Sequence, residues 1–187
     1  MTARKRLKAF GITATAAALA VIPAAAAHAG VGNGTWLNQP WAWVHFAPTV
    51  VSDHLTIVQG DDIAAVCKVN DSAGATWDLV VDHNLDYAGY TAASYLDSPA
   101  GVWCSQAGIP THLVESAWAH LHPDATWEHQ VLSSGDPVSV MCSRQFWDPT
   151  VGQWLWWDLV VDQNTNITGY VSDGAVYGST PASSVLC

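Results

Sequence analysis

The sequence predicts an all-β protein made of two small barrels in tandem, behind a cleaved signal peptide. Three observations support this fold class. The hexapeptide WDLVVD occurs twice, at residues 77–82 and 157–162. Its first copy places Trp, Leu and Val on one side of the chain, with the period of two that is typical of a strand with one apolar face. No stretch after residue 29 has the periodicity of an amphipathic helix.

The first 29 residues have the features of a secretory signal peptide. Four basic residues come first, and residues 10–22 form an apolar stretch that is too short to span a bilayer. The segment Ala27-His28-Ala29 then offers a cleavage site of the A-x-A type. We therefore expect the mature chain to be secreted, soluble and extracellular, with cell-wall association as a further option.

Without the signal peptide the chain is strongly acidic. The whole sequence contains 6 Lys and Arg and 16 Asp and Glu, and four of the basic residues lie before residue 30. Lys68 and Arg144 remain against the 16 acidic residues, which gives a mature net charge of −14. Such a surface repels phosphate backbones and anionic lipid headgroups. The charge therefore argues against nucleic acid and membranes as partners.

The mature chain repeats itself. With a shift of 75, residues 42–67 match residues 117–142 without a gap. Beyond the cysteine that ends each segment the shift becomes 80, because the second copy holds five additional residues. A boundary near Gly108 gives a first unit at 30–107, with an N-terminal extension, and a second unit at 108–187. We interpret this pattern as a tandem duplication.

Each unit contains signals for short strands separated by tight turns. Residues 63–66 and 138–141 are apolar runs after Gly-Asp turns, and residues 84–89 and 164–169 are polar turns that end in glycine. Five or six strands in each unit, with a turn about every 8–12 residues, predict a small barrel. Barrels of about 60–80 residues have thin cores and often need a covalent staple.

Four cysteines can supply these staples in an oxidising compartment. Each unit has one cysteine after its Gly-Asp turn and one at its end, so the repeat favours the pairs Cys67–Cys104 and Cys142–Cys187. Each bridge would contribute about 3–4 kcal/mol in the chain-entropy model. Bridges that cross between the units are the alternative, and free catalytic thiols are less favoured.

Both units also share a longer motif. A histidine precedes a proline by three residues, a Gly-Asp turn follows about a dozen residues later, and a strand ending in cysteine, a tryptophan strand and a Gly-Tyr pair complete the pattern. The chain shows it as His45 to Pro48 with Gly89-Tyr90, and as His120 to Pro123 with Gly169-Tyr170. In this pattern the units resemble bacterial SH3-like domains of exported actinobacterial proteins, with histidine at the position of the family's opening arginine.

This resemblance implies a non-catalytic module, because such domains commonly bind cell-wall peptide or glycan. We expect a secreted binding or scaffold protein that recognises peptidoglycan or another envelope ligand and needs no cofactor. An inhibitor or partner of an extracellular protein is the alternative, and the acidic surface favours it. A secreted hydrolase is the least favoured function.

The sequence gives little support for catalysis. Asp78 and Asp82 lie on one face of a strand but roughly 13 Å apart at about 3.3 Å per residue, which is more than the carboxyl spacing of a glycosidase. We expect both carboxylates on the solvent face of their strand. The chain also contains no Gly-x-Ser-x-Gly motif.

Histidines give a weak indication of metal binding. His120 and His122 are spaced to share one side of a strand, and His129 and His45 add donors. Zinc needs three or four convergent ligands. We expect instead that His45 and His120 replace a structural arginine and bond the backbone of the proline turn.

A second indication concerns calcium. The segments 82–86 and 162–166 begin like a calcium-binding loop, but Tyr87 and Ile167 stand where the loop needs glycine. We expect hairpin turns there and no metal.

Tryptophan is the strongest functional signal, with eleven residues in the mature chain. Four occupy matching positions and are interpreted as core or barrel-face residues: Trp43, Trp77, Trp118 and Trp157. Trp147, Trp154 and Trp156 lie in or beside the five-residue insertion and flank a turn. We expect them to be exposed and to bind sugar rings, prolines or another protein. The alternative is that they pack against the first unit and hold the pair together.

Overall fold

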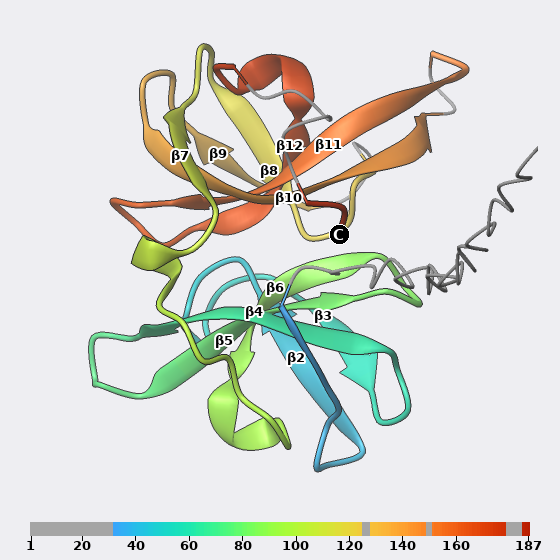
Figure 1. Ribbon diagram of the computed structural model, residues 1–187, viewed down its shortest axis with the longest axis vertical. Coiled ribbons are helices and arrows are strands. Elements are labelled where there is room, and N and C mark those ends of the chain that lie inside the picture. The colour runs from blue at the N-terminus through green and yellow to red at the C-terminus, as the bar shows by residue number, and fades with distance from the viewer. Residues whose placement is uncertain (1–31, 125–127, 149–150, 179–184) are drawn as a thin grey trace, which may run out of the picture.

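The computed structural model describes residues 32–124, 128–148, 151–178 and 185–187 (Figure 1). The expected signal peptide at 1–29 lies outside these ranges. Within them, no helix is both long enough and apolar enough to cross a membrane.

The strands form two six-stranded antiparallel sheets, one from each repeat (Figure 1). The first has the order β1-β4-β5-β6-β2-β3, with these bounds: β1 (Asn33–Thr35), β2 (Trp41–His45), β3 (His54–Val58), β4 (Ile63–Asn70), β5 (Thr76–Asp82) and β6 (Tyr87–Ala92).

The second sheet has the corresponding order β7-β10-β11-β12-β8-β9. Its strands are β7 (Ile109–His112), β8 (Ala117–His120), β9 (His129–Leu132), β10 (Pro137–Asp148), β11 (Gln153–Asp162) and β12 (Thr168–Ser172). Three short 3₁₀ turns complete the described chain, at η1 (Ala93–Tyr95), η2 (Cys104–Gln106) and η3 (Asp173–Ala175). The all-β prediction is therefore confirmed.

The structural repeat begins earlier than the sequence match does. β1 pairs with β4 as β7 pairs with β10, with Thr35 and Thr111 at corresponding positions. Gly32 and Gly108 precede these two strands with φ values of 83° and 73°. A Cβ on either glycine would clash with a carbonyl of the neighbouring strand, so the position requires glycine. The segment expected as an N-terminal extension thus provides the first strand of the sheet.

Apolar side chains gather in three clusters, one inside each repeat and one shared between them. In β5, Val80 belongs to the cluster of the first repeat, whereas Leu79 and Val81 belong to the shared cluster. In β11, Val160 belongs to the cluster of the second repeat, whereas Leu159 belongs to the shared cluster. Since neighbouring strand residues point to opposite faces, each central strand is buried on both sides.

The contact between the repeats is reciprocal. The backbone N–H of Ala88 donates to the carbonyl of Leu121 at 2.8 Å, and the N–H of Thr168 donates to the carbonyl of Phe46 at 2.8 Å. Ala88 and Thr168 match in the repeat, and so do Phe46 and Leu121. Each repeat therefore presents the same surface to the other, as the subunits of a two-fold symmetric dimer do.

The Gly-Tyr pairs belong to this arrangement. A Cβ on Gly89 would lie 2.9 Å from the carbonyl oxygen of His45, and a Cβ on Gly169 would lie 2.9 Å from backbone atoms of His120. The adjoining Tyr90 and Tyr170 are fully buried in the shared cluster. Glycine thus permits the close approach of strands that brings each tyrosine between the repeats.

The disulfides lie at the same shared cluster. The structure joins Cys67 to Cys104 and Cys142 to Cys187, the pairing that the repeat favours, and no cysteine is free. A bulge precedes Cys67 in β4 and Cys142 in β10. Because a bulge adds one residue to a strand, Val66 can join the same cluster as Cys67.

The expectation that Asp78 and Asp82 lie on a solvent face is wrong, because both are buried. Asp78 accepts a hydrogen bond from the N–H of Ala100 at 2.8 Å. Asp82 accepts hydrogen bonds from the N–H groups of Asn84 and Leu85 at 2.8 and 3.1 Å. The polar face of β5 is covered by its own repeat, and these backbone donors reach one oxygen of each carboxylate. The other oxygen of each is buried without a hydrogen-bond partner among the described residues.

The pKa of Asp82 is raised to about 6, first by burial and then by the neighbouring carboxyl of Asp61. Asp61 closes its own turn, where its carboxylate accepts the N–H of Val58 at 2.7 Å. The two acids therefore form a close pair at one end of the first sheet.

Candidate functional site

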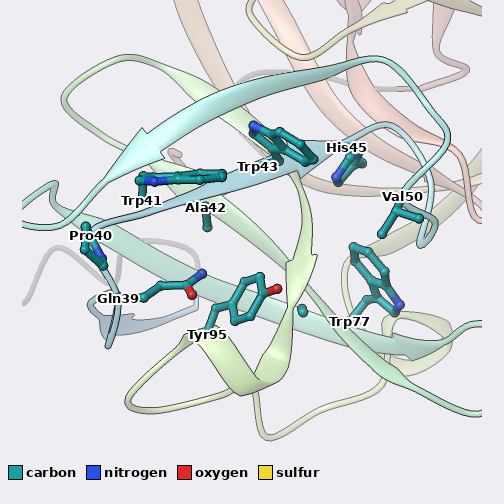
Figure 2. Close-up of a pocket in the computed structure, with 10 residues that line it drawn as sticks. Gln39, Pro40, Trp41, Ala42, Trp43, His45, Val50, Trp77 and Tyr95 are labelled. Carbon is teal, nitrogen blue, oxygen red and sulfur yellow. The ribbon is translucent and has the colours of Figure 1, made fainter.

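The first repeat has a cavity of about 350 Å³ lined largely by aromatic side chains (Figure 2). Trp41, Trp43 and His45 follow one another along β2, and Tyr95 and Trp77 lie across the cavity from them. The remaining lining residues are Gln39, Pro40, Ala42, Val50 and Ala92.

The wall on β2 consists of two indole rings. Trp41 and Trp43 share one face of the strand because they are two residues apart, and their ring centroids are 5.5 Å apart at an angle of 45°. The ring of His54, from the neighbouring β3, lies 4.3 Å from the ring of Trp43. Both tryptophans are exposed, at 51% and 41%. They therefore form a supported aromatic surface that a ligand can reach.

His45 is a buried neutral imidazole at the base of the cavity. Its Nδ1 lies 3.2 Å from the carbonyl oxygen of Ser52, and a carbonyl only accepts, so Nδ1 carries the proton and Nε2 is left as an acceptor. Burial lowers the pKa of His45, the Ser52 bond opposes this change, and nearby His54 adds to it. The expected bond from His45 to the loop that contains Pro48 is thus confirmed.

Trp77 is held in place from outside the cavity. Its indole N–H donates to the Asp71 carboxylate at 3.1 Å, and that carboxylate also accepts the N–H groups of Ala73 and Ala75 at 2.8 Å. The pKa of Asp71 is lowered, first by the bond from Trp77. The ring meets His45 edge-on at 5.8 Å between centroids. The hairpin turn thereby fixes the orientation of an aromatic ring that lines the cavity.

The second repeat has a corresponding cavity of about 240 Å³. Trp118, His120 and Trp157 hold the positions of Trp43, His45 and Trp77 in the first cavity. The other lining residues are Glu115, Ser116, Ala117, Ser172 and Ala175. Serine and alanine thus replace Trp41 and Tyr95, and glutamate replaces Pro40. The second cavity is smaller, and it lacks two of the aromatic walls of the first.

The candidate binding residues of the insertion lie elsewhere. Trp147 and Trp154 face each other across the long β10–β11 hairpin, with ring centroids 6.0 Å apart, and they are 51% and 62% exposed. Trp156 lies opposite Gln145 and is half-buried. None of the three tryptophans lines either of the two aromatic cavities. The expected exposure of Trp147 and Trp154 is therefore confirmed.

The four matched tryptophans received one interpretation from the sequence, as core or barrel-face residues, but they differ in burial in the structure. Trp77 and Trp157 are buried, whereas Trp43 and Trp118 are exposed walls of the cavities. One signal could have found the first wall: the alternation Trp41-Ala42-Trp43 places two large rings on one face of a strand, and only small Ala42 on the other.

The candidate metal donors converge only in part, since the rings of His120 and His129 lie 5.6 Å apart and His122 lies elsewhere. His120 meets the ring of Trp157 at 5.9 Å, whereas His122 lies beyond the end of β8 and meets Tyr87 of the first repeat at 5.7 Å. The prediction that both imidazoles share one side of a strand is therefore wrong. Within the described ranges, no group of three His, Cys, Asp or Glu side chains is placed to hold a metal ion.

The calcium-like segments are tight turns. Residues 83–86 form a turn in which Asp86 has a φ of 61°, and Asn166 has a φ of 57° at the corresponding position. Asp86 makes an ion pair with Arg144 of the other repeat. A hairpin turn was expected for this segment, and the ion pair between repeats was not.

The two residues with fixed positive charge after residue 29 are both engaged. Arg144 pairs with Asp86, and the ammonium group of Lys68 lies 5.1 Å from the ring centroid of Trp103. The first cavity is lined by neither Asp nor Glu and neither Lys nor Arg, so aromatic faces and neutral polar groups define its chemistry. Comparison with known proteins adds no relative, since no family model, curated protein or solved structure matches the chain.

Proposed function

We propose that this chain is a secreted, non-catalytic binding protein with two SH3-like repeats, and that its first repeat binds an envelope ligand. The observation that carries the proposal is the cavity in which Trp41 and Trp43 lie opposite Tyr95 and Trp77. Cavities with aromatic walls and a few placed polar groups are typical of ligand sites. The SH3-like assignment rests on the shared His-x-x-Pro, Gly-Asp and Gly-Tyr pattern of both repeats.

The lining favours an uncharged, extended ligand. Indole and phenol rings stack on the apolar faces of sugars and on prolines. The Nε2 of His45 can accept a hydrogen bond, the Tyr95 hydroxyl can donate or accept one, and the Gln39 amide can do both. This combination suits a glycan strand or a peptide of the cell wall. A polyanion is disfavoured, because the net charge of the mature chain is −14.

Retention on purified peptidoglycan tests this proposal. The mature chain is incubated with the insoluble polymer beside two double variants, Trp41→Ala/Trp43→Ala and Trp147→Ala/Trp154→Ala. Each variant removes two exposed indoles, so the comparison separates the cavity from the hairpin. We expect at least a tenfold loss of affinity in the first variant, about 1.4 kcal/mol, and little change in the second.

Three results would count against the proposal. If the parent protein is not retained, the wall ligand is wrong. If only the hairpin variant loses retention, the site lies on β10 and β11. If neither variant loses retention, the bound surface contains neither pair. Circular dichroism of each variant establishes that the fold is kept.

A protein partner is the second candidate function. The acidic surface favours it, since the net charge after residue 29 is −14. The exposed acidic side chains are Asp53, Asp62, Asp97, Glu115 and Glu128. Such an acidic protein would coelute with a basic secreted protein at low salt and separate at high salt. Capture that does not respond to salt would argue against this mode.

A further inference from the structure

We infer that the cavity of the second repeat is a separate site for a primary ammonium group on an alkyl chain, such as a lysine side chain of a peptide. This inference goes beyond the proposed function, because it concerns the other repeat and a ligand of different chemistry. It rests on the residues that differ between two cavities built from the same strands.

Three exchanges add hydrogen-bond acceptors to the second cavity, and a fourth, Tyr95 to Ala175, removes a ring and its hydroxyl. Glu115 stands in the second cavity where Pro40 stands in the first, and Ser116 replaces Trp41. Ser172 replaces Ala92 in the same way. The second cavity thus has a carboxylate and two hydroxyl oxygens in place of an apolar rim. All three groups can accept hydrogen bonds from an ammonium group, and the hydroxyl of Ser116 already accepts one from the N–H of Ser134 at 3.2 Å.

An aromatic surface remains beside these acceptors. The ring of Trp118 lines the cavity and is 54% exposed. His129 stacks against this ring at 4.2 Å and 21°, which covers one face and holds the indole in place. An alkylammonium group can lie against the exposed part of the ring and gain a cation–π interaction. The alkyl chain then meets Trp157 and Ala175, the apolar part of the lining.

The local charge is not neutralised by the protein itself. A second acidic residue, Asp173, lies between the lining residues Ser172 and Ala175, where the first repeat has Ala93. One carboxyl oxygen of Asp173 is buried without a hydrogen-bond partner among the described residues. Since Lys68 and Arg144 are engaged elsewhere, a cation for this site has to come from a ligand.

A nuclear magnetic resonance titration of the mature chain tests the inference. The probes are Nα-acetyl-lysine methylamide and its uncharged analogue Nα-acetyl-norleucine methylamide, at pH 7 and constant ionic strength. The indole N–H signal of Trp118, identified by its loss in Trp118→Phe, reports binding. We expect saturable shifts with the lysine probe and weaker binding of the norleucine probe.

Glu115→Gln is the decisive variant, and Asp97→Asn is its control, because each removes one negative charge and Asp97 is exposed in the other repeat. We expect Glu115→Gln to lower the affinity for the lysine probe two- to fivefold, about 0.4–1 kcal/mol. Asp97→Asn should leave this affinity unchanged. Equal binding of the two probes, or equal effects of the two variants, would overturn the inference. Peptidoglycan retention by Glu115→Gln should stay unchanged, which separates this test from that of the first cavity.

Discussion

Replacing Leu159 with alanine should destabilise both repeats at once. Leu159 is fully buried in the shared cluster, together with Leu79 of the first repeat. Leu→Ala changes at buried sites cost about 2–5 kcal/mol, because the transfer energy of the side chain is lost and a cavity remains. For a chain of this size we expect the melting temperature to fall by about 6–15 °C.

The assay is guanidinium unfolding of the oxidised mature chain, followed by tryptophan fluorescence and far-ultraviolet circular dichroism. The comparison variant is Leu132→Ala, which is equally buried but belongs to the cluster of the second repeat alone. We expect one transition for the parent chain and for each variant, with coincident probes and the same m value, because the shared cluster couples the repeats.

Two separate transitions in the parent chain, with Leu132→Ala moving only one of them, would contradict this prediction. That outcome would mean that the shared cluster contributes too little to join the repeats into one cooperative unit. A change of less than about 1 kcal/mol in Leu159→Ala would equally contradict the full burial of this side chain.

Three further predictions concern other parts of the fold. Gly169→Ala places a Cβ 2.9 Å from backbone atoms of His120, so we expect a loss of about 1–3 kcal/mol or more in thermal unfolding. Because the pKa of Asp82 is raised to about 6, the folded protein binds this proton more tightly than the unfolded chain does, and stability falls as pH rises from about 4 to 6. Asp61→Asn removes the like charge, which is a smaller cause of the raised pKa than burial. Denaturant unfolding should therefore show a gain in stability of less than about 1 kcal/mol at pH 7.5 and little change at pH 4. Tyr170→Phe removes a buried hydroxyl that has no hydrogen-bond partner among the described residues, so unfolding should show unchanged stability or a gain of up to about 1 kcal/mol.

Matched variants control these three measurements. Gly34→Ala adds a Cβ that meets nothing within 4 Å, so it should cost much less than Gly169→Ala. Asp97→Asn removes a charge from an exposed side chain and should leave the pH dependence of stability as it is. If it flattens the profile as Asp61→Asn does, net charge and not the Asp61–Asp82 pair is responsible. A loss above about 1 kcal/mol in Tyr170→Phe would mean that the hydroxyl is bonded.

Local pattern was sufficient for several features of this chain. The alternation in β5, the Gly-Asp turns and the repeat itself predicted an all-β chain with strands in two corresponding sets. The positions of Cys67 and Cys104 within one copy favoured the bridge that the structure contains. His45, close to Pro48 in sequence, bonds the loop that follows, as expected. These features depend on residues near one another in the chain or on comparison of the two copies.

The site depended on information that the local pattern does not contain. Trp43 and Trp77 each occupy a matched position, yet one is an exposed wall and the other is buried. The lining of the first cavity combines β2 with Tyr95, about fifty residues later in the chain. Which aromatic rings meet is decided by the pairing of β2 with β6, and nothing in either segment alone specifies that pairing.

Alternation and turn chemistry act over a few residues, so the sequence alone indicated the turns and most of the strands. Comparison of its two halves indicated the duplication, and the strand β1 was not predicted. Only the tertiary structure decided what covers each face of a strand. Leu79 lies in the cluster shared with the other repeat, and Asp78 is buried where solvent was expected. A period of two separates the faces of a strand, but packing against residues about eighty positions away decides which face is buried.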